Sequence, residues 1–198
     1  MLKRLFDIIF SSIGLILASP LMLLVGLAVK TNSPGPVFYQ SERVGQHGKK
    51  FKLHKFRTMT VDAEKANIWS TAADDSRITK IGHFLRKYNL DELPQLFNVL
   101  MGQMSLVGPR PQVSWAVELY NKEEREIILS VKPGLTDLAS LKFLNEAEIL
   151  KGSQDPDKDY LLKIDPEKRR LNIEYVKNHS LWIDIKIIFK TIFKIINS

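Results

Sequence analysis

Two adjacent carboxylates, Asp91 and Glu92, have the types and spacing to bind a metal ion or to act as a nucleophile. Apolar residues then recur at helical spacing, at Leu93, Leu96, Phe97 and Leu100. With Gly102 as a C-terminal cap, this pattern predicts a helix that begins at Asp91. Acids at a helix start also have a structural explanation, because they cap free N–H groups and complement the macrodipole. Taken alone, the segment favours the structural explanation.

Arg110, which lies between Pro109 and Pro111, favours chemistry instead. Each proline fixes its own φ angle, so the backbone around the guanidinium is stiff. A guanidinium held in place suits the recognition of a phosphate or carboxylate, because two of its N–H groups can bind such a group together. A rigid cation therefore follows the acid pair closely in the sequence.

Basic residues alternate with apolar ones at 51–57, which predicts a strand with one cationic face. Residues 37–40 fit a partner strand, and residues 45–50 fit the hairpin loop between them. Lys55 and Arg57 on this strand either bind an anion or form a solvated edge that resists aggregation. The pattern alone does not separate these two interpretations.

A helix is predicted between this strand and the acid pair, from apolar residues at Ile78, Ile81, Phe84 and Leu85. Arg77 precedes it and Arg86 lies within it. Positive charge thus recurs on several elements before Asp91.

The composition limits the class of protein. The chain has 198 residues, a formal net charge of +7 and no cysteine, so disulfides and thiolate zinc sites are excluded. The four histidines show no metal-ligand spacing. The positive charge predicts anionic partners, but no recognisable nucleic-acid-binding motif is present and the basic residues adjoin apolar segments. We therefore expect no nucleic acid among the partners.

An apolar block at residues 5–29 is long enough to cross a hydrocarbon core of about 30 Å. A signal peptide and a straight membrane-spanning helix are two interpretations of this block. Pro20 lies near its middle, and basic residues flank both ends. We favour a re-entrant helix broken at Ser19 and Pro20, in which the Ser19 hydroxyl bonds a carbonyl that the proline frees.

The last apolar segment, residues 182–196, carries Lys186, Lys190 and Lys194 in one narrow stripe. An amphipathic helix at a membrane interface explains the stripe through anionic headgroups, with Trp182 at the boundary. A helix that packs in the protein interior is the alternative.

Together, these segments closely resemble the bacterial sugar transferase family, the small monotopic phosphoglycosyl transferases. The likeness spans roughly Lys3 to Ile188. It is carried by the apolar block with Ser19-Pro20, by Lys55-Phe56-Arg57-Thr58-Met59, by Leu90-Asp91-Glu92-Leu93-Pro94-Gln95-Leu96-Phe97-Asn98-Val99-Leu100 and by Met104-Ser105-Leu106-Val107-Gly108-Pro109-Arg110-Pro111. The last two motifs are highly specific in that order and spacing.

The resemblance implies a membrane-bound transferase that moves a sugar-1-phosphate from a UDP-sugar to undecaprenyl phosphate and releases UMP. This is the first membrane step of glycoconjugate assembly, for O-antigen, capsule, exopolysaccharide or glycoprotein. Asp91 then takes the place of the nucleophile and Glu92 that of the Mg²⁺ ligand. Family habits suggest an N-acetylated amino sugar as the donor. The substrate-binding residues that we expect are Lys55, Arg57, Arg77, Arg86, Pro109, Arg110, Pro111 and Asp137.

Two departures from the family pattern concern the site. Pro133-Gly134-Leu135-Thr136 matches the family, but the sequence differs from Asp137 to Phe143, which suggests altered sugar recognition. Asn172 stands where many members carry aspartate, so any catalytic role of that acid is absent here or is taken by Glu174.

Two other functions stay open. The first is direct transfer between the substrates, with Asp91 acting only as a metal ligand. The second is a non-catalytic membrane anchor or scaffold whose basic strand binds anionic lipid headgroups.

The expected fold class is α+β and mainly helical. Residues 1–32 form the re-entrant helix, residues 33–180 the catalytic domain with its small β-hairpin, and residues 181–198 the interfacial helix of the same domain. We expect a monotopic protein of the bacterial inner membrane, in contact with phospholipids, with its catalytic domain on the cytoplasmic face. The oligomeric state stays open, and a homodimer is one option.

Overall fold

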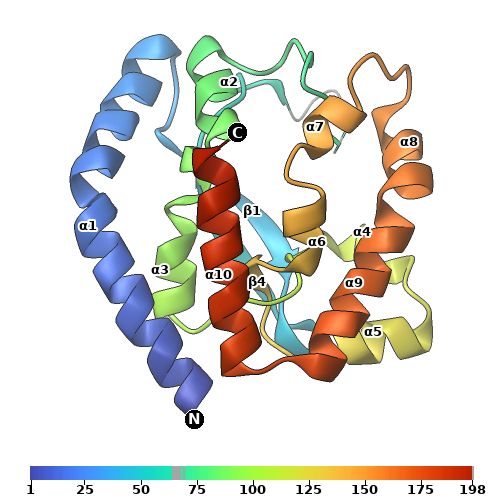
Figure 1. Cartoon of the computed structure of the whole chain (residues 1–198). Coiled ribbons are helices and arrows are strands. Elements are labelled where there is room, and N and C mark those ends of the chain that lie inside the picture. Colours follow the sequence, from blue (N-terminus) through green and yellow to red (C-terminus); the bar gives the residue numbers. More distant parts are fainter. Residues whose placement is uncertain (64–67, 69, 198) are drawn as a thin grey trace.

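The computed structural model describes residues 1–63, 68 and 70–197. A long helix lies along one side of the molecule, most of the short helices lie on the opposite side, and two small sheets lie between them (Figure 1). The fold is therefore mainly helical with a small share of strand, as predicted.

The long helix α1 (Leu2–Asn32) is continuous although it contains Pro20. Proline has no N–H, so the carbonyl of Ile16 loses its donor within the helix. The Ser19 hydroxyl donates to that carbonyl at 2.8 Å, which confirms the bond predicted from the sequence. The helix bends near its middle without ending (Figure 1), so the predicted break is a bend. Within the described residues, α1 is the one helix long and apolar enough to cross a membrane.

The two central strands, β1 (Phe38–Val44) and β2 (Lys50–Phe56), form an antiparallel hairpin in which Phe38 lies opposite Phe56. A short 3₁₀ turn, η1 (Gln46–Gly48), connects them. The predicted hairpin is confirmed, although β1 continues four residues beyond the predicted end. Leu53 and Phe56 of β2 are buried in two apolar clusters, which fixes the hairpin to the helices.

Helix α2 (Lys80–Lys87) follows the hairpin and agrees with the prediction. Thr79 caps it by accepting a hydrogen bond from the Gly82 amide. A Cβ on Gly82 would lie 2.1 Å from the Thr58 carbonyl oxygen, so glycine permits the close approach of α2 to the chain beyond β2. A 3₁₀ turn, η3 (Leu90–Glu92), and helix α3 (Gln95–Leu100) come next.

A second pair of strands, β3 (Ser105–Val107) and β4 (Gly134–Thr136), is parallel and was not predicted. The two backbones touch at their ends, because a Cβ on Gly134 would lie 2.1 Å from the Gly108 nitrogen. Strands of three residues carry too little alternation to be found by pattern.

The remaining helices cover the other side of the sheets. Helix α10 (Leu181–Ile196) is capped by Ser180 and buries Asp184 and Ile187, while its three lysines stay exposed. Helices α1, α3, α9 and α10 share one apolar cluster with both pairs of strands. The short helices are α4 (Ser114–Glu118), α5 (Lys122–Ile128), α6 (Leu138–Lys142), α7 (Glu146–Ile149), α8 (Pro156–Lys163) and α9 (Asp165–Asn178).

Candidate active site

The acid pair lies on η3, in the turn between α2 and α3. Asn89 has a left-handed φ of 52°, and the 3₁₀ turn follows it directly. Helix α3 begins only at Gln95, so the predicted helix start at Asp91 is wrong by four residues. Its N-cap is Pro94, and no side chain caps it. Neither acid caps α3, so the capping part of the structural explanation for the pair is wrong.

Glu92 binds two cations from distant parts of the chain. Its Oε1 lies 2.7 Å from Lys55 Nζ and 2.5 Å from Arg110 Nη2. Burial alone raises the pKa of Glu92, but the charges of Arg110 and Lys55 outweigh it and hold that pKa at about 2. Glu92 is therefore ionised at neutral pH, and within the described residues both of its contacts use the same oxygen.

Asp91 has the opposite electrostatics, although it is the next residue. Its side chain is buried, and its Oδ2 lies 3.9 Å from Lys55 Nζ. Burial raises the pKa of Asp91 above its usual range, Lys55 opposes this effect, and the charge of Glu92 adds to it. The pair thus combines an ionised acid held by two cations with a more basic carboxylate, whose one ion pair among the described residues is the long contact to Lys55.

Arg110 is held from both sides by backbone hydrogen bonds. Its Nη1 donates to the Leu135 carbonyl at 2.5 Å. The Gly108 amide donates to Thr136 at 3.0 Å, and the Gly134 amide donates to Pro109 at 2.9 Å, so β4 holds one flank. On the other flank, the Val44 amide of β1 donates to the Gln112 carbonyl at 2.8 Å. Two strands thus fix the Pro109-Arg110-Pro111 segment, as its prolines suggested.

Arg86 and Asp137 complete the charged surroundings. Arg86 Nε donates to Thr58 Oγ1 at 2.9 Å. Burial lowers the pKa of Arg86, while the negative charge of Asp91 acts to raise it. Asp137 is fully buried and caps α6 by accepting a hydrogen bond from the Ser140 amide at 2.6 Å. Its Oδ2 has no partner within the described residues, and burial raises the pKa of Asp137.

Comparison with known sequence families shows which kind of protein contains this cluster of acids and cations. The model of the bacterial sugar transferase family matches residues 1–198. The chain belongs to the bacterial sugar transferase family.

Curated relatives of this chain come from several bacteria. The chain is 45% identical over 97% of its length to the UDP-glucose:undecaprenyl-phosphate glucose-1-phosphate transferase of Klebsiella pneumoniae, and covers 39% of that protein. It is 42% identical over 96% of its length to the undecaprenyl-phosphate galactose phosphotransferase of Salmonella typhimurium, and again covers 39%. It is 38% identical over 96% of its length to the exopolysaccharide production protein ExoY of Sinorhizobium fredii, and covers 83%. The chain thus spans about two fifths of the length of the first two relatives.

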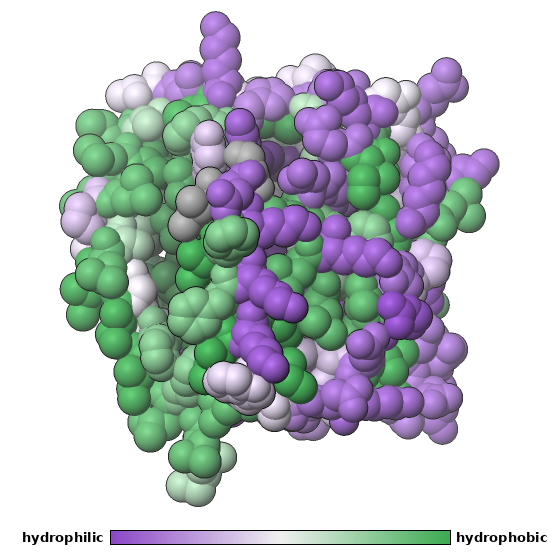
Figure 2. Space-filling model, in the orientation of Figure 1, coloured by the Kyte–Doolittle hydropathy of each residue, from purple (hydrophilic) through white to green (hydrophobic). Residues whose placement is uncertain are grey.

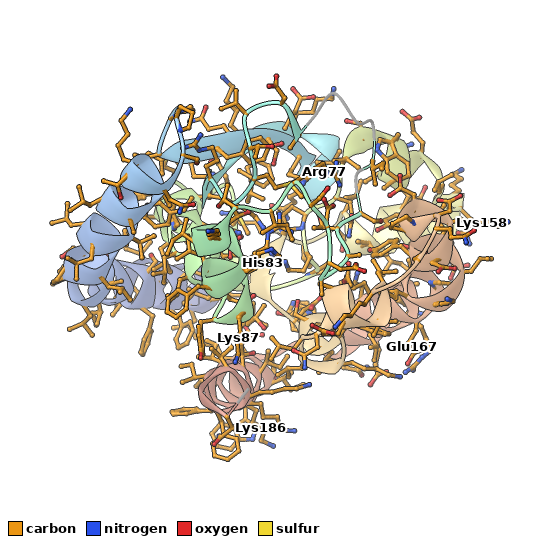
Figure 3. All side chains as sticks on the ribbon, turned by 90° about the horizontal axis from the view of Figure 1, so that it is seen from above. Arg77, His83, Lys87, Lys158, Glu167 and Lys186 are labelled. Carbon is orange, nitrogen blue, oxygen red and sulfur yellow. The ribbon has the colours of Figure 1, made fainter. Side chains whose placement is uncertain are left out.

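Two arginines expected to bind substrate form their contacts with other parts of the chain. Arg57 is buried, and its guanidinium donates to the carbonyls of Ser33 and Pro34 at the end of α1. Arg77 lies in the chain before α2 (Figure 3), where its Nη2 lies 2.7 Å from Asp75 Oδ2 and its Nε also donates to that carboxylate. Its Nη1 donates to the carbonyls of Ala63 and Ile68. Neither contacts Asp91 or Glu92 in the described part of the chain. Both arginines hold loops in place.

Asn98 is a positioning residue that the sequence did not reveal. Its Oδ1 accepts from the His54 amide at 3.1 Å, and its Nδ2 donates to the Lys52 carbonyl at 2.7 Å. The side chain therefore joins α3 to β2 on either side of Leu53, just before Lys55. A lone asparagine on a helical pattern carried no signal for this role.

A buried ionic contact holds the start of α1 against the segment that carries Arg110. Lys3 Nζ lies 2.5 Å from Asp184 Oδ2 of α10 and donates to the Val107 carbonyl at 3.1 Å. The Tyr175 hydroxyl lies 2.7 Å from Asp184 Oδ1 and 3.1 Å from the same carbonyl oxygen. Four elements, α1, β3, α9 and α10, meet at this point. These residues belong to no common motif in the sequence.

The acid pair fits a magnesium ion that also binds substrate phosphate. The described residues contain no group of three or more metal-binding side chains. Mg²⁺ commonly takes one or two protein carboxylates, keeps several waters and binds substrate phosphates. Glu92 is ionised, and its Oε2 forms no hydrogen bond or ion pair with another described residue, so this oxygen suits such a ligand.

Proposed function

We propose that this chain transfers a sugar-1-phosphate from a UDP-sugar to undecaprenyl phosphate, with Asp91 as nucleophile and Glu92 as Mg²⁺ ligand. The observation that carries the proposal is the pairing of a buried, more basic Asp91 with an ionised Glu92 beside Lys55 and Arg110. The names of the relatives, which are UDP-sugar and undecaprenyl-phosphate transferases, support the same substrates.

The transfer takes two displacements. In the first, an Asp91 carboxylate oxygen attacks the phosphorus that bears the sugar, and the bond from this phosphorus to the bridging oxygen breaks. UMP leaves with the electron pair, and the sugar-phosphate stays bound to Asp91. In the second, a phosphate oxygen of the lipid attacks the same phosphorus, the bond to Asp91 breaks, and the carboxylate is regenerated.

Cations are needed because a carboxylate and a diphosphate repel each other. Mg²⁺, when bound at Glu92, supplies charge neutralisation on the diphosphate oxygens. Arg110 and Lys55 now share Glu92 Oε1, and we expect both to turn partly to the phosphates when the donor binds. Arg86 extends the cationic surroundings on the α2 side. Arg57 and Arg77 support the site through the loops that they hold.

The membrane part of the proposal rests on α1 and α10. Apolar side chains cover one side of the molecule, while the opposite side is hydrophilic (Figure 2). Both ends of α1 contact the same body, since Arg4 near the start donates to the Val99 carbonyl and Val29 near the end is buried beside Phe56. A re-entrant α1 at the cytoplasmic face accounts for a helix that bends, exposes apolar residues and returns to the body.

Turnover with a panel of UDP-sugars tests this function. The purified protein in detergent or nanodiscs is given undecaprenyl phosphate, Mg²⁺ and each UDP-sugar in turn, including glucose, galactose and N-acetylated donors. We expect UMP release with a narrow set of donors and its loss in Glu92→Gln. The absence of UMP with every donor contradicts the proposal. UMP that appears only when both substrates are present favours direct transfer.

A further inference from the structure

An open groove of about 700 Å³ lies between α6 and α10. Lysine side chains from both helices supply positive charge in the groove, and apolar side chains between these lysines form its wall. The cationic residues are Lys142, Lys190 and Lys194, and the apolar ones are Leu138, Leu141 and Phe193.

The three lysines of the groove differ in whether they are free to bind a ligand. Lys142 pairs with Glu167 at 2.6 Å, and Lys194 donates to the Leu141 carbonyl at 2.5 Å across the groove. Lys190 is exposed, and no acid among the described residues pairs with it. A ligand with both a phosphate and a hydrocarbon chain uses the lysines and the apolar wall together. A free phosphate or a sugar leaves the apolar wall unused.

The groove opens where the apolar side of the molecule meets the hydrophilic side. Figure 2 shows a row of hydrophilic side chains along α10 between the two halves. Phe193, which lines the groove, is 71% exposed, and its neighbour Phe189 one turn earlier is 70% exposed on the same helix. In the proposed orientation, the mouth lies at the level of lipid phosphates, and a hydrocarbon chain can leave it directly into the bilayer.

The groove is also connected to the acid pair through α6. This helix has five residues, so it is about 7.5 Å long. It is capped by Asp137, two residues after Leu135, whose carbonyl accepts the hydrogen bond from Arg110. A ligand in the groove is therefore separated from Arg110 by little more than one short helix.

We infer that this groove binds the phosphate and first isoprene units of the polyprenyl phosphate acceptor, with Lys190 as the main phosphate contact. The inference rests on the proposed function and assigns the second substrate a place. The second displacement above then requires the acceptor phosphate to pass from the groove along α6 to the sugar-bearing phosphorus on Asp91.

Two measurements separate this inference from the proposed function, one made without acceptor and one that depends on the acceptor. A UMP burst with donor alone measures the first displacement, and the KM for undecaprenyl phosphate reports on the second. We expect Lys190→Gln to keep the burst and to raise the KM about tenfold, the loss of one hydrogen bond to a charged group. The double variant Lys190→Gln, Lys194→Gln raises it further.

Lys186→Gln is the matched control, because it removes the same charge from the same helix. Lys186 does not line the groove. It lies on the outer face of α10 (Figure 3), 5.1 Å from the centre of the Trp182 ring. We expect its KM to stay near that of the natural sequence. An equal rise in both single variants overturns the inference, since it indicates a general attraction to the membrane.

A binding assay without turnover keeps the inference testable even if no UMP is released. A fluorescent short-chain isoprenyl phosphate is titrated against the protein in nanodiscs of neutral lipid. Weaker binding in Lys190→Gln than in Lys186→Gln supports the inference, and equal binding overturns it. Competition by phosphatidylglycerol at the same concentration as undecaprenyl phosphate also overturns it, because the groove is then a headgroup site.

Discussion

Arg110 Nη2 lies 2.5 Å from Glu92 Oε1, while Nη1 of the same guanidinium donates to the Leu135 carbonyl at 2.5 Å. One side chain thus joins the acid pair to β4. The position of Glu92 therefore depends on the planar guanidinium of Arg110, which donates in two directions. A lysine carries its charge at one point and cannot reproduce both bonds.

Arg110→Lys is therefore expected to lower kcat/KM about 100-fold, although it keeps the positive charge. Steady-state UMP release measures this change. Arg125→Lys is the control, because Arg125 is exposed on α5. We expect that variant to retain the activity of the natural sequence. Equal activity in Arg110→Lys contradicts a role for the guanidinium that bonds Glu92 and the Leu135 carbonyl together.

The acid limb of the pH profile follows from the environment of Asp91. Asp91 must be ionised to attack, so activity is lost as the pH falls through its raised pKa. Lys55 favours the ionised form. Lys55→Gln should therefore raise the pKa of Asp91 further and move the acid limb of kcat/KM to higher pH.

Lys52→Gln provides the comparison for this shift. Lys52 is exposed on the same strand, and we expect Lys52→Gln to leave the acid limb of kcat/KM at the same pH. The profile is measured from UMP release across the pH range in which the folded protein is stable. A limb that moves to lower pH in Lys55→Gln contradicts the assignment of Asp91.

The contact between Lys3 and Asp184 predicts a large effect on stability. Asp184 is fully buried, so Lys3→Met leaves its carboxylate with the Tyr175 hydroxyl as its one remaining side-chain partner among the described residues. We expect a loss of about 3 kcal/mol in the free energy of unfolding, which Asp184→Asn in the same chain partly restores. Thermal unfolding in detergent, analysed as a double-mutant cycle, gives the coupling energy. A coupling near zero contradicts the buried pair.

The topology of α1 can be read with single cysteines, because the natural sequence has none. Leu2→Cys and Asn32→Cys place exposed thiols at the two ends of α1. In a re-entrant helix, an impermeant maleimide labels both from the cytoplasmic side and neither from outside. Labelling of the two ends from opposite sides indicates a helix that spans the membrane.

Local patterns predicted the elements with enough residues to show a period. The hairpin, α2 and α10 follow from alternation or helical spacing, and Gly102 ends the α3 segment with a left-handed φ of 83° as expected. The start of α3 was placed too early, because the same apolar spacing fits a 3₁₀ turn followed by a helix. What decides between them is the left-handed backbone of Asn89, which the pattern does not encode.

Long-range contacts explain what the sequence left undetermined in the site. The cations of Lys55 and Arg110 meet at Glu92 only after β2, η3 and the segment after β3 pack together. Arg57 looked equivalent to Lys55 on the strand pattern. Its side chain instead binds the carbonyls where the chain leaves α1, and nothing near Arg57 in the sequence marks that turn.

The central claim is that Asp91 carries the sugar-phosphate between the two substrates. It is tested most directly by incubating the protein with UDP-sugar labelled with ³²P in the sugar-linked phosphate, without acceptor, and then locating the label by peptide mapping. The account predicts label on the peptide that contains Asp91, its release by undecaprenyl phosphate, and neither label nor turnover in Asp91→Asn. Full turnover in Asp91→Asn would contradict it.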